Sequence, residues 1–218
     1  MMIRPFARRL LPLLRYALAA LLCGCTLVGA HAQPACGELA NQYGPFDYRS
    51  KRDSLKIVED YHFNSGVEAG IRGQSSSNAA GDISYLMRTS PNHHRGLMAI
   101  LRIADRSKSP HPSGLQYSVE CYFDRAIRFQ PDDTVVRALY AQYLHARRRV
   151  AEARAQLDVA VEYAGDRALS HYNLGLVYFD IGEHDRALTQ AHKARALGFE
   201  SEELASRLKA AGKWKNVD

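Results

Sequence analysis

Hydrophobic and small residues recur at a spacing of 34 positions in the second half of the chain, from about residue 115 to residue 199. Large apolar residues recur at one set of positions in each repeat, and alanines recur at another. The matching positions are Phe123, Leu157 and Ala191; Ala126, Ala160 and Ala194; Phe129, Tyr163 and Leu197; and the pairs Tyr140 with Leu174, Ala141 with Gly175, Leu144 with Tyr178 and Ala153 with Ala187. A period of this length indicates stacked supersecondary units.

The residue types at these positions predict that each unit is a pair of antiparallel helices. Only alanine or glycine fits where two helices cross closely, which accounts for Ala141 with Gly175 and Ala153 with Ala187. Larger side chains fill the space beside each crossing. One pair cannot bury its apolar face alone, so the pairs must stack. We therefore expect an all-α fold.

Turn and cap residues divide the chain into segments. These are a leader over 1–32, an irregular N-terminal arm over 33–51 that includes YGPFDYR, a degenerate capping helical hairpin over 52–90, a unit with an insertion over 91–133, units over 134–167 and 168–201, and a C-terminal capping helix over 202–218. Residues 55–73 have a helical pattern, and the last helix is expected to be capped near Ser201.

Three helix ends follow from local residues. Ser90 is expected to cap a helix over 91–106, with Pro91 at its first position. The pair Asp132-Asp133 offers an N-cap after Pro131. Gly165 is expected to end the helix that precedes it.

The unit over 168–199 resembles the tetratricopeptide repeat (TPR). It has Leu174-Gly175, Tyr178, Gly182, Ala187 and Ala194 where that family's pattern has Leu-Gly, Tyr, Gly, Ala and Ala, while His171 and Phe199 depart from its usual Trp and Pro. The resemblance is strong over 115–199 and weak over 52–114. It implies a right-handed superhelical solenoid of about three TPR units plus capping helices. With the leader, Cys36 and the arm, the chain resembles exported bacterial TPR proteins, which implies fold and compartment but no reaction.

Residues 1–32 have the pattern of a cleaved signal peptide. A basic start precedes an apolar run from Tyr16 to Gly29, and Ala30-His31-Ala32 predicts cleavage after Ala32. We expect a periplasmic or secreted protein. The alternative is a membrane-anchored lipoprotein, because the residues around Cys25 resemble a lipobox.

The leader also explains the basic composition. The chain has a net charge of +6 and a pI near 9.2. Four arginines and no acidic residue lie in residues 1–32, so about +2 remains for the rest. A nucleic-acid partner is therefore not expected.

Export changes the cysteine chemistry as well. Cys36 and Cys121 remain after the leader, 85 residues apart. An oxidising compartment favours one disulfide, worth about 4–5 kcal/mol in the chain-entropy model if it is unstrained. Two unrelated buried thiols are the alternative.

Catalytic and metal-binding motifs are absent from the sequence. It has no His-Glu-x-x-His, P-loop or Gly-x-Ser-x-Gly pattern. Glu59 and His62 have Glu-x-x-His spacing without the second copy that a di-iron site needs. His93 and His94 point in different directions on a helix, so capping or packing is the preferred interpretation. We expect no enzyme, cofactor or metal site.

The TPR resemblance implies that the first helix of each pair lines a concave groove. The groove positions are Asn92, Arg95 and Arg102; Gln142 and His145; and Tyr172, Asn173, Leu176, Phe179 and Asp180. The expected function is an exported scaffold that binds a protein or peptide of the cell envelope, with the partner's acidic end towards Arg95 and Arg102.

Three alternatives stay open. Tyr172, Leu176 and Phe179 could instead pack on the C-terminal helix. The protein could be an envelope enzyme or ligand-binding protein whose site lies in the arm and first hairpin and uses Asp47, Glu59 and His62. It could also be a purely architectural subunit of an envelope assembly.

Overall fold

The computed structural model describes residues 35–199 and 202–216. The chain separates into two compact units, 1–33 and 34–218, and the second contains every described residue. Three of the sequence expectations lie outside the described residues. They are the signal peptide with its cleavage site at Ala32, the alternative anchor Cys25 and the cap Ser201. Within the described ranges, no helix combines the length and apolar character needed to cross a bilayer.

The fold is all-α, as the sequence predicts: the described residues form ten helices and no strand. The helices are α1 (Arg52–His62), α2 (Ser65–Glu68), α3 (Ala79–Thr89), α4 (His94–Ser107), α5 (Val119–Phe129), α6 (Thr134–Ala146), α7 (Val150–Ala164), α8 (Ala168–Asp180), α9 (His184–Ala196) and α10 (Glu202–Ala210). Residues 35–51 form an irregular arm without a helix.

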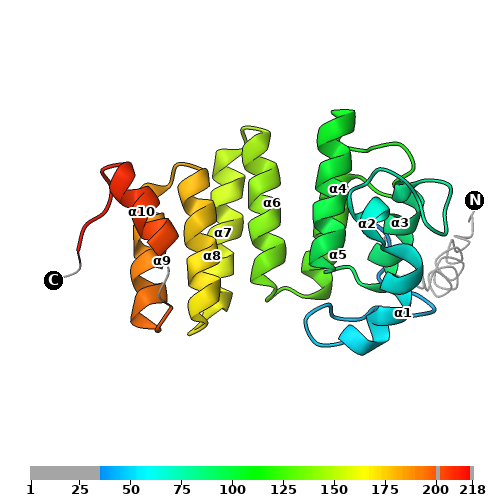
Figure 1. Cartoon of the computed structure of the whole chain (residues 1–218), viewed down its shortest axis with the longest axis horizontal. Helices are drawn as coiled ribbons and strands as arrows, with labels where there is room; N and C mark the ends of the chain where they lie inside the picture. The colour runs from blue at the N-terminus through cyan, green and yellow to red at the C-terminus, as the bar shows by residue number, and fades with distance from the viewer. Residues whose placement is uncertain (1–34, 200–201, 217–218) are drawn as a thin grey trace, which may run out of the picture. The chain divides into compact units, whose positions relative to one another are not determined.

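The C-terminal half is built from helix pairs. The most extensive packing joins α6 to α7 and α8 to α9 (Figure 1). Helix α4 also contacts α5 and α6, α6 contacts α8, and α8 contacts α10. Each pair therefore packs on the next, and α4, α6 and α8 meet in sequence order.

Small residues lie at the close crossings, as predicted. Ala141, Ala153 and Ala187 have no exposed surface. At Gly175 an added Cβ would lie 2.5 Å from Cδ2 of Leu204 on α10 and 3.2 Å from Cβ of Gln190 on α9. A side chain at this position would push two neighbouring helices away from α8.

Two of the expected helix ends are confirmed. Oδ1 of Asp133 accepts hydrogen bonds from the backbone N–H of Val135 and of Val136, at 3.1 and 3.3 Å, and so caps α6. Helix α7 ends at Ala164, and Gly165 follows with a φ of 55°.

The expected start of α4 is wrong by three residues. The helix begins at His94 with His93 as its N-cap, because Nδ1 of His93 accepts a hydrogen bond from the Gly96 N–H at 3.0 Å. Ser90 instead ends α3 through its backbone N–H, which donates to the Leu86 carbonyl at 2.8 Å. Pro91 and Asn92 then form the turn between the two helices.

The helical pattern over 55–73 is also interrupted. Helix α1 ends at His62, and Oδ1 of Asn64 accepts a hydrogen bond from the Val67 N–H at 3.0 Å to start α2. Helix α2 has only four residues. The interruption turns the chain so that α2 contacts both α3 and α4.

Candidate functional site

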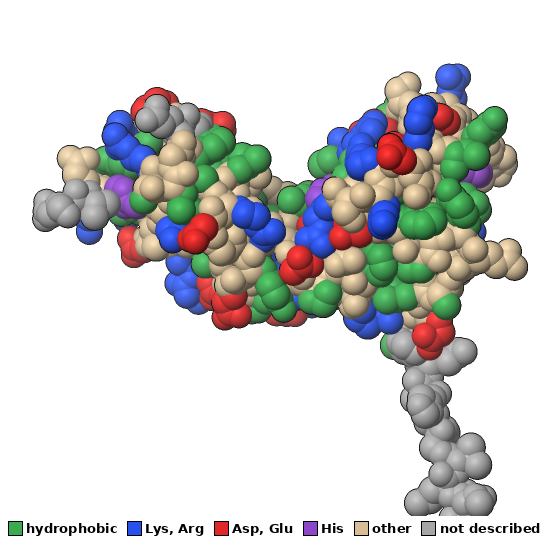
Figure 2. Space-filling model, turned by 90° about the horizontal axis from the view of Figure 1, so that it is seen from below, with side chains coloured by type: hydrophobic (Ala, Val, Ile, Leu, Met, Phe, Trp, Pro, Cys, Tyr) green, Lys and Arg blue, Asp and Glu red, His purple; other side chains and the backbone are tan. Residues whose placement is uncertain are grey.

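The predicted groove residues fall into three sets, at α4, at α6 and at α8. Figure 2 shows that the surface of the described unit is hollowed between its N-terminal and C-terminal helices. Helix α6 packs between α4 and α8. The three sets are described in that order.

The arginines on α4 bind the chain's own α2. Nε and Nη2 of Arg95 donate to the two carboxylate oxygens of Glu68, at 2.9 and 2.5 Å, and Nη1 of Arg102 donates to the Glu68 carbonyl at 3.0 Å. The hydrogen bond from Arg95 lowers the pKa of Glu68, against the effect of burial. Arg95 and Arg102 therefore both bind α2, and contact of the same two side chains with an acidic partner stays a prediction.

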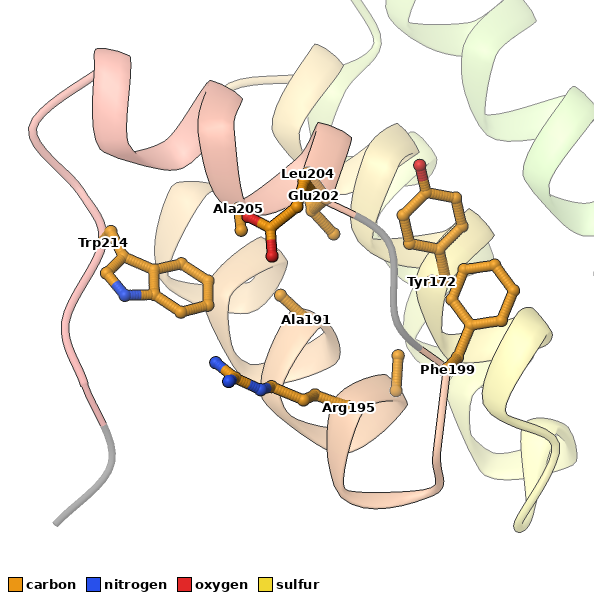
Figure 3. Close-up of a pocket in the computed structure, with 9 residues that line it drawn as sticks. Tyr172, Ala191, Arg195, Phe199, Glu202, Leu204, Ala205 and Trp214 are labelled. Carbon is orange, nitrogen blue, oxygen red and sulfur yellow. The ribbon is translucent and has the colours of Figure 1, made fainter.

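Helix α10 occupies the other end of the predicted groove. The hydroxyl of Tyr172 donates to Oε2 of Glu203 at 3.0 Å. The Arg207 guanidinium lies 4.4 Å from the centre of the Phe179 ring and pairs with Asp180. The alternative in which these side chains pack on the C-terminal helix therefore describes Tyr172 and Phe179. Figure 3 shows the ring of Tyr172 against that of Phe199, with centroids 4.7 Å apart.

The middle set, on α6 and the facing side of α8, remains open. Gln142 and Asn173 are exposed, and both line a cavity of about 160 Å³ between the two helices. Within the described residues neither side-chain amide has a hydrogen bond. The rest of the lining is Thr134, Val135, Ala138, Leu139, Ser170, Leu174 and Val177.

His145 lies near the end of α6 and is half-buried. Its Nδ1 atom is buried and has no hydrogen-bond partner among the described residues. His145 is not part of the lining of the α6–α8 cavity. The structure thus brings Gln142 and Asn173 together and leaves His145 beside them.

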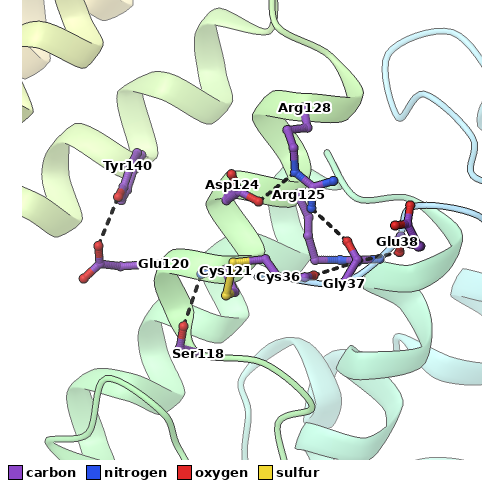
Figure 4. The surroundings of a disulfide bond; sticks show 10 residues. All are labelled: Cys36, Gly37, Glu38, Ser118, Glu120, Cys121, Asp124, Arg125, Arg128 and Tyr140. Atoms are coloured by element: carbon purple, nitrogen blue, oxygen red, sulfur yellow. Dashed lines mark hydrogen bonds and ion pairs between the residues drawn. A yellow bond between two sulfur atoms is a disulfide. The ribbon is translucent and has the colours of Figure 1, made fainter. Parts of the chain in front are cut away.

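The expected disulfide is present and fixes the N-terminal arm to α5. Cys36 and Cys121 are joined with an S–S distance of 2.06 Å (Figure 4). Nη1 of Arg125 donates to the carbonyls of Cys36 and Glu38, at 3.0 and 2.7 Å. Arg125 is only 2% exposed, and this burial lowers its pKa. A covalent bond and a buried cation therefore hold the arm at the same place.

The YGPFDYR segment of the arm joins the starts of α4 and α6. Nδ2 of Asn92 donates to Oδ1 of Asp47 and to Oδ2 of Asp133, both at 2.8 Å. Arg49 pairs with Asp47 at 2.8 Å and with Asp132 at 3.0 Å. Burial raises the pKa of Asp47, but the hydrogen bonds from Arg49 and Asn92 outweigh it and lower the pKa to about 2. Asp47 is therefore an ionised structural group.

Two adjacent histidines, His93 and His94, complete this contact between the arm and the starts of α4 and α6, which is called the arm joint below. Nε2 of His93 lies 2.8 Å from Oε1 of Glu59, and Nε2 of His94 lies 2.8 Å from Oδ2 of Asp133. The Tyr48 ring lies 4.2 Å from that of His93 and 4.9 Å from that of His94, between centroids. The two rings cap and pack, and within the described part of the chain no group of three or more His, Cys, Asp or Glu side chains is placed to hold a metal ion.

The three residues of the alternative site do not gather. Asp47 and Glu59 belong to the arm joint, whereas His62 pairs with Asp82 through an Nδ1 to Oδ1 contact of 2.7 Å. His62 also lines a cavity of about 330 Å³ with Tyr43, Ile57, Val58, Tyr61 and Tyr85. This cavity combines an imidazole with exposed aromatic rings.

Asp82 is the residue that the sequence interpretation missed. Its carboxylate is fully buried and accepts hydrogen bonds from the backbone N–H groups of Gln74, Ser75 and Ser76, at 2.6 to 3.3 Å. Burial raises its pKa, but these bonds and the one from His62 outweigh it and lower the pKa. The polar segment QSSSNAAGD over 74–82 is the sequence feature that indicates a loop here, and its backbone N–H groups surround the Asp82 carboxylate.

Comparison with known proteins adds no relative to this description: no family model matches the chain, and no match is found among curated proteins or solved structures.

Proposed function

We propose that the chain is an exported TPR-type scaffold that binds a protein or peptide partner of the cell envelope through the facing surfaces of α6 and α8. The 34-residue period and the packing of α6 with α7 and α8 with α9 support a right-handed solenoid of helix pairs. About three such units, preceded by the hairpin of α1 to α3 and followed by α10, account for the described helices.

The α6–α8 cavity carries this proposal. Its lining is mostly apolar, and the side-chain amides of Gln142 and Asn173, which have no hydrogen bond within the described residues, lie at its edge. An amide offers both a donor and an acceptor, which matches the N–H and C=O groups of an extended chain. An apolar side chain of the partner fits the cavity while its backbone bonds to the two amides. Most of the other predicted groove positions already bind within the chain, whereas Nδ1 of His145 has no hydrogen-bond partner among the described residues.

The disulfide supports the proposed compartment. Structural disulfides persist in oxidising surroundings and are rare in reducing ones. The leader pattern over 1–32 is consistent with this and supports a location in the periplasm or outside the cell. An anchor at Cys25 is the alternative, in which the protein stays attached to a membrane. Mass spectrometry of the mature N-terminus separates cleavage after Ala32 from lipidation of Cys25.

A paired substitution tests the surface. The variant Gln142→Arg with Asn173→Arg is expected to lose capture of the partner from an envelope extract while keeping its helicity. The matched control is Ala151→Arg with Ala155→Arg, which adds the same charge to exposed positions of α7. If the α6–α8 variant captures the same protein as well as the control does, the proposed surface is wrong.

The His62 cavity supports a second candidate, a ligand-binding or enzymatic site in the arm and first hairpin. The observation that favours it is the His62–Asp82 pair beside an aromatic cavity. Asp82 can hold the imidazole in one orientation, leaving Nε2 for a ligand. The imidazole NMR signals of His62 should then shift when the low-molecular-weight fraction of a cell-envelope extract is added to the protein. Unchanged signals would reject this candidate.

A further inference from the structure

A cavity at the C-terminal end of the described chain combines aromatic walls with two opposite charges. It has a volume of about 180 Å³ and lies between α8, α9 and α10. Figure 3 shows Tyr172 and Phe199 on one side and Trp214 on the other. Drug-sized ligands occupy pockets of about 300–1,000 Å³, so this cavity suits a smaller molecule.

Backbone hydrogen bonds build the aromatic walls. The chain turns after α10, and the N–H groups of Lys213 and Trp214 donate to the Leu208 carbonyl at 2.8 and 3.2 Å. This turn brings the indole back to α9, where its centroid lies 4.8 Å from that of His192. On the other wall, the Phe199 N–H donates to the Ala194 carbonyl at 3.0 Å. The rings are therefore fixed before any ligand arrives.

The charged groups are Arg195 and Glu202. Both side chains point into the space between the aromatic walls (Figure 3). Within the described residues they do not form an ion pair with each other, and the Arg195 guanidinium has no hydrogen bond or ion pair. Glu202 has only a distant contact with Lys209, at 3.9 Å. A guanidinium and a carboxylate thus face one cavity without neutralising each other.

We propose that this cavity binds a small zwitterion, of the class formed by betaines and free amino acids. A ligand carboxylate pairs with the Arg195 guanidinium, which is shaped for two parallel hydrogen bonds to such a group. The ligand's ammonium group lies against the Tyr172 and Phe199 rings, whose faces attract cations, and near Glu202, because Nζ of Lys209 already lies 5.5 Å from the centre of the Trp214 ring. The small side chains of Ala191 and Ala205 leave room for the ligand's apolar part.

The only tryptophan of the chain is Trp214, so its fluorescence reports on this cavity and on the neighbouring one of about 710 Å³ that Trp214 also lines; the variants below distinguish the two. The test is a titration of the full mature protein with glycine betaine and, separately, with L-leucine. Choline, which lacks the carboxylate, and acetate, which lacks the cation, are the controls. A saturable change with either zwitterion, at least about tenfold tighter than with both controls, supports the proposal. The two titrations also distinguish a quaternary from a primary ammonium ligand.

Substitutions complete the experiment. Arg195→Gln and Glu202→Gln are each expected to weaken binding about tenfold, while Arg148→Gln, an exposed arginine in the turn after α6, leaves it unchanged. A thermal unfolding curve shows whether each variant is folded. The proposal is overturned if neither zwitterion gives a saturable change, if choline or acetate binds as tightly, or if the folded Arg195→Gln variant binds like the wild type.

Discussion

Nε2 of His93 lies 2.8 Å from Oε1 of Glu59, while Nδ1 of the same ring accepts the Gly96 N–H at 3.0 Å. An imidazole that accepts at Nδ1 and donates at Nε2 is neutral. Glu59 therefore holds His93 in the one tautomer that can cap α4. The ring is fully buried, and this burial lowers its pKa from the ordinary value of 6.5 in spite of the nearby carboxylate.

The first prediction is that stability falls as the pH is lowered below about 6.5. The unfolded chain takes up a proton at His93 more readily than the folded chain, so acid favours unfolding. The contribution is complete above the unfolded pKa and is lost as the pH falls through the lower, folded pKa. Urea unfolding at pH 7.5, 6.5 and 5.5 measures the effect. In His93→Asn, which keeps a capping oxygen, the free energy of unfolding should depend less steeply on pH over this range. An unchanged dependence would show that other titratable groups cause it.

The second prediction concerns the disulfide. Cys36→Ser with Cys121→Ser should lower the free energy of unfolding by about 2–5 kcal/mol, because the closed loop restricts the unfolded chain. The wild-type protein in reductant should show the same loss, whereas reductant should not affect the double variant. Mass spectrometry of the unreduced protein provides the control. Two free thiols in the protein purified from an oxidising compartment would contradict the bond.

The third prediction tests the crossing of α8 with its neighbours. Gly175→Ala should destabilise the protein by about 1–3 kcal/mol, as overpacking does. The added Cβ would approach Cδ2 of Leu204 to 2.5 Å. In the background Leu204→Ala the same substitution should cost much less, since the clashing methyl group is absent. Additive costs in this double-mutant cycle would show that α10 does not pack here.

The fourth prediction concerns the arm joint. Asn92→Ala should cost about 2–3 kcal/mol, because it removes one partner of Asp47 and one partner of the buried Asp133. Amide hydrogen exchange should increase at Tyr48, whose N–H donates to Oδ1 of Asn92 at 3.1 Å. Exchange in α9 should stay the same. If amide hydrogen exchange instead became faster by the same factor in all helices, the substitution would be destabilising the whole protein rather than the arm joint alone.

Local residue chemistry was sufficient to predict much of the fold. The 34-residue period marked the helix pairs of the second half, and Asp133, Gly165 and the pair Cys36–Cys121 lie where the sequence placed them. Each of these features depends on residue type at a fixed spacing. A cap, a helix stop and a disulfide between two such cysteines have few physical alternatives.

Features that depend on contacts distant in sequence were missed. Ser90 has the residue type of a cap, but its backbone is needed to end α3, so His93 takes the role. Glu68 binds Arg95 from 27 positions away, while the packing of α10 on Tyr172 and Phe179 was one of the alternatives that the sequence left open. No spacing rule contains these pairings. The groove was therefore predicted as longer and more charged than the surface that remains open.

Photo-crosslinking from the open surface tests the central claim most directly. A photoreactive amino acid is placed at Gln142 or Asn173, with Ala155 on α7 as the control position, and the protein is exposed to light in an intact envelope extract. The account predicts that one and the same partner is crosslinked from positions 142 and 173 and not from position 155. A partner crosslinked from position 155 alone, or none from 142 and 173, would contradict binding at the α6–α8 surface.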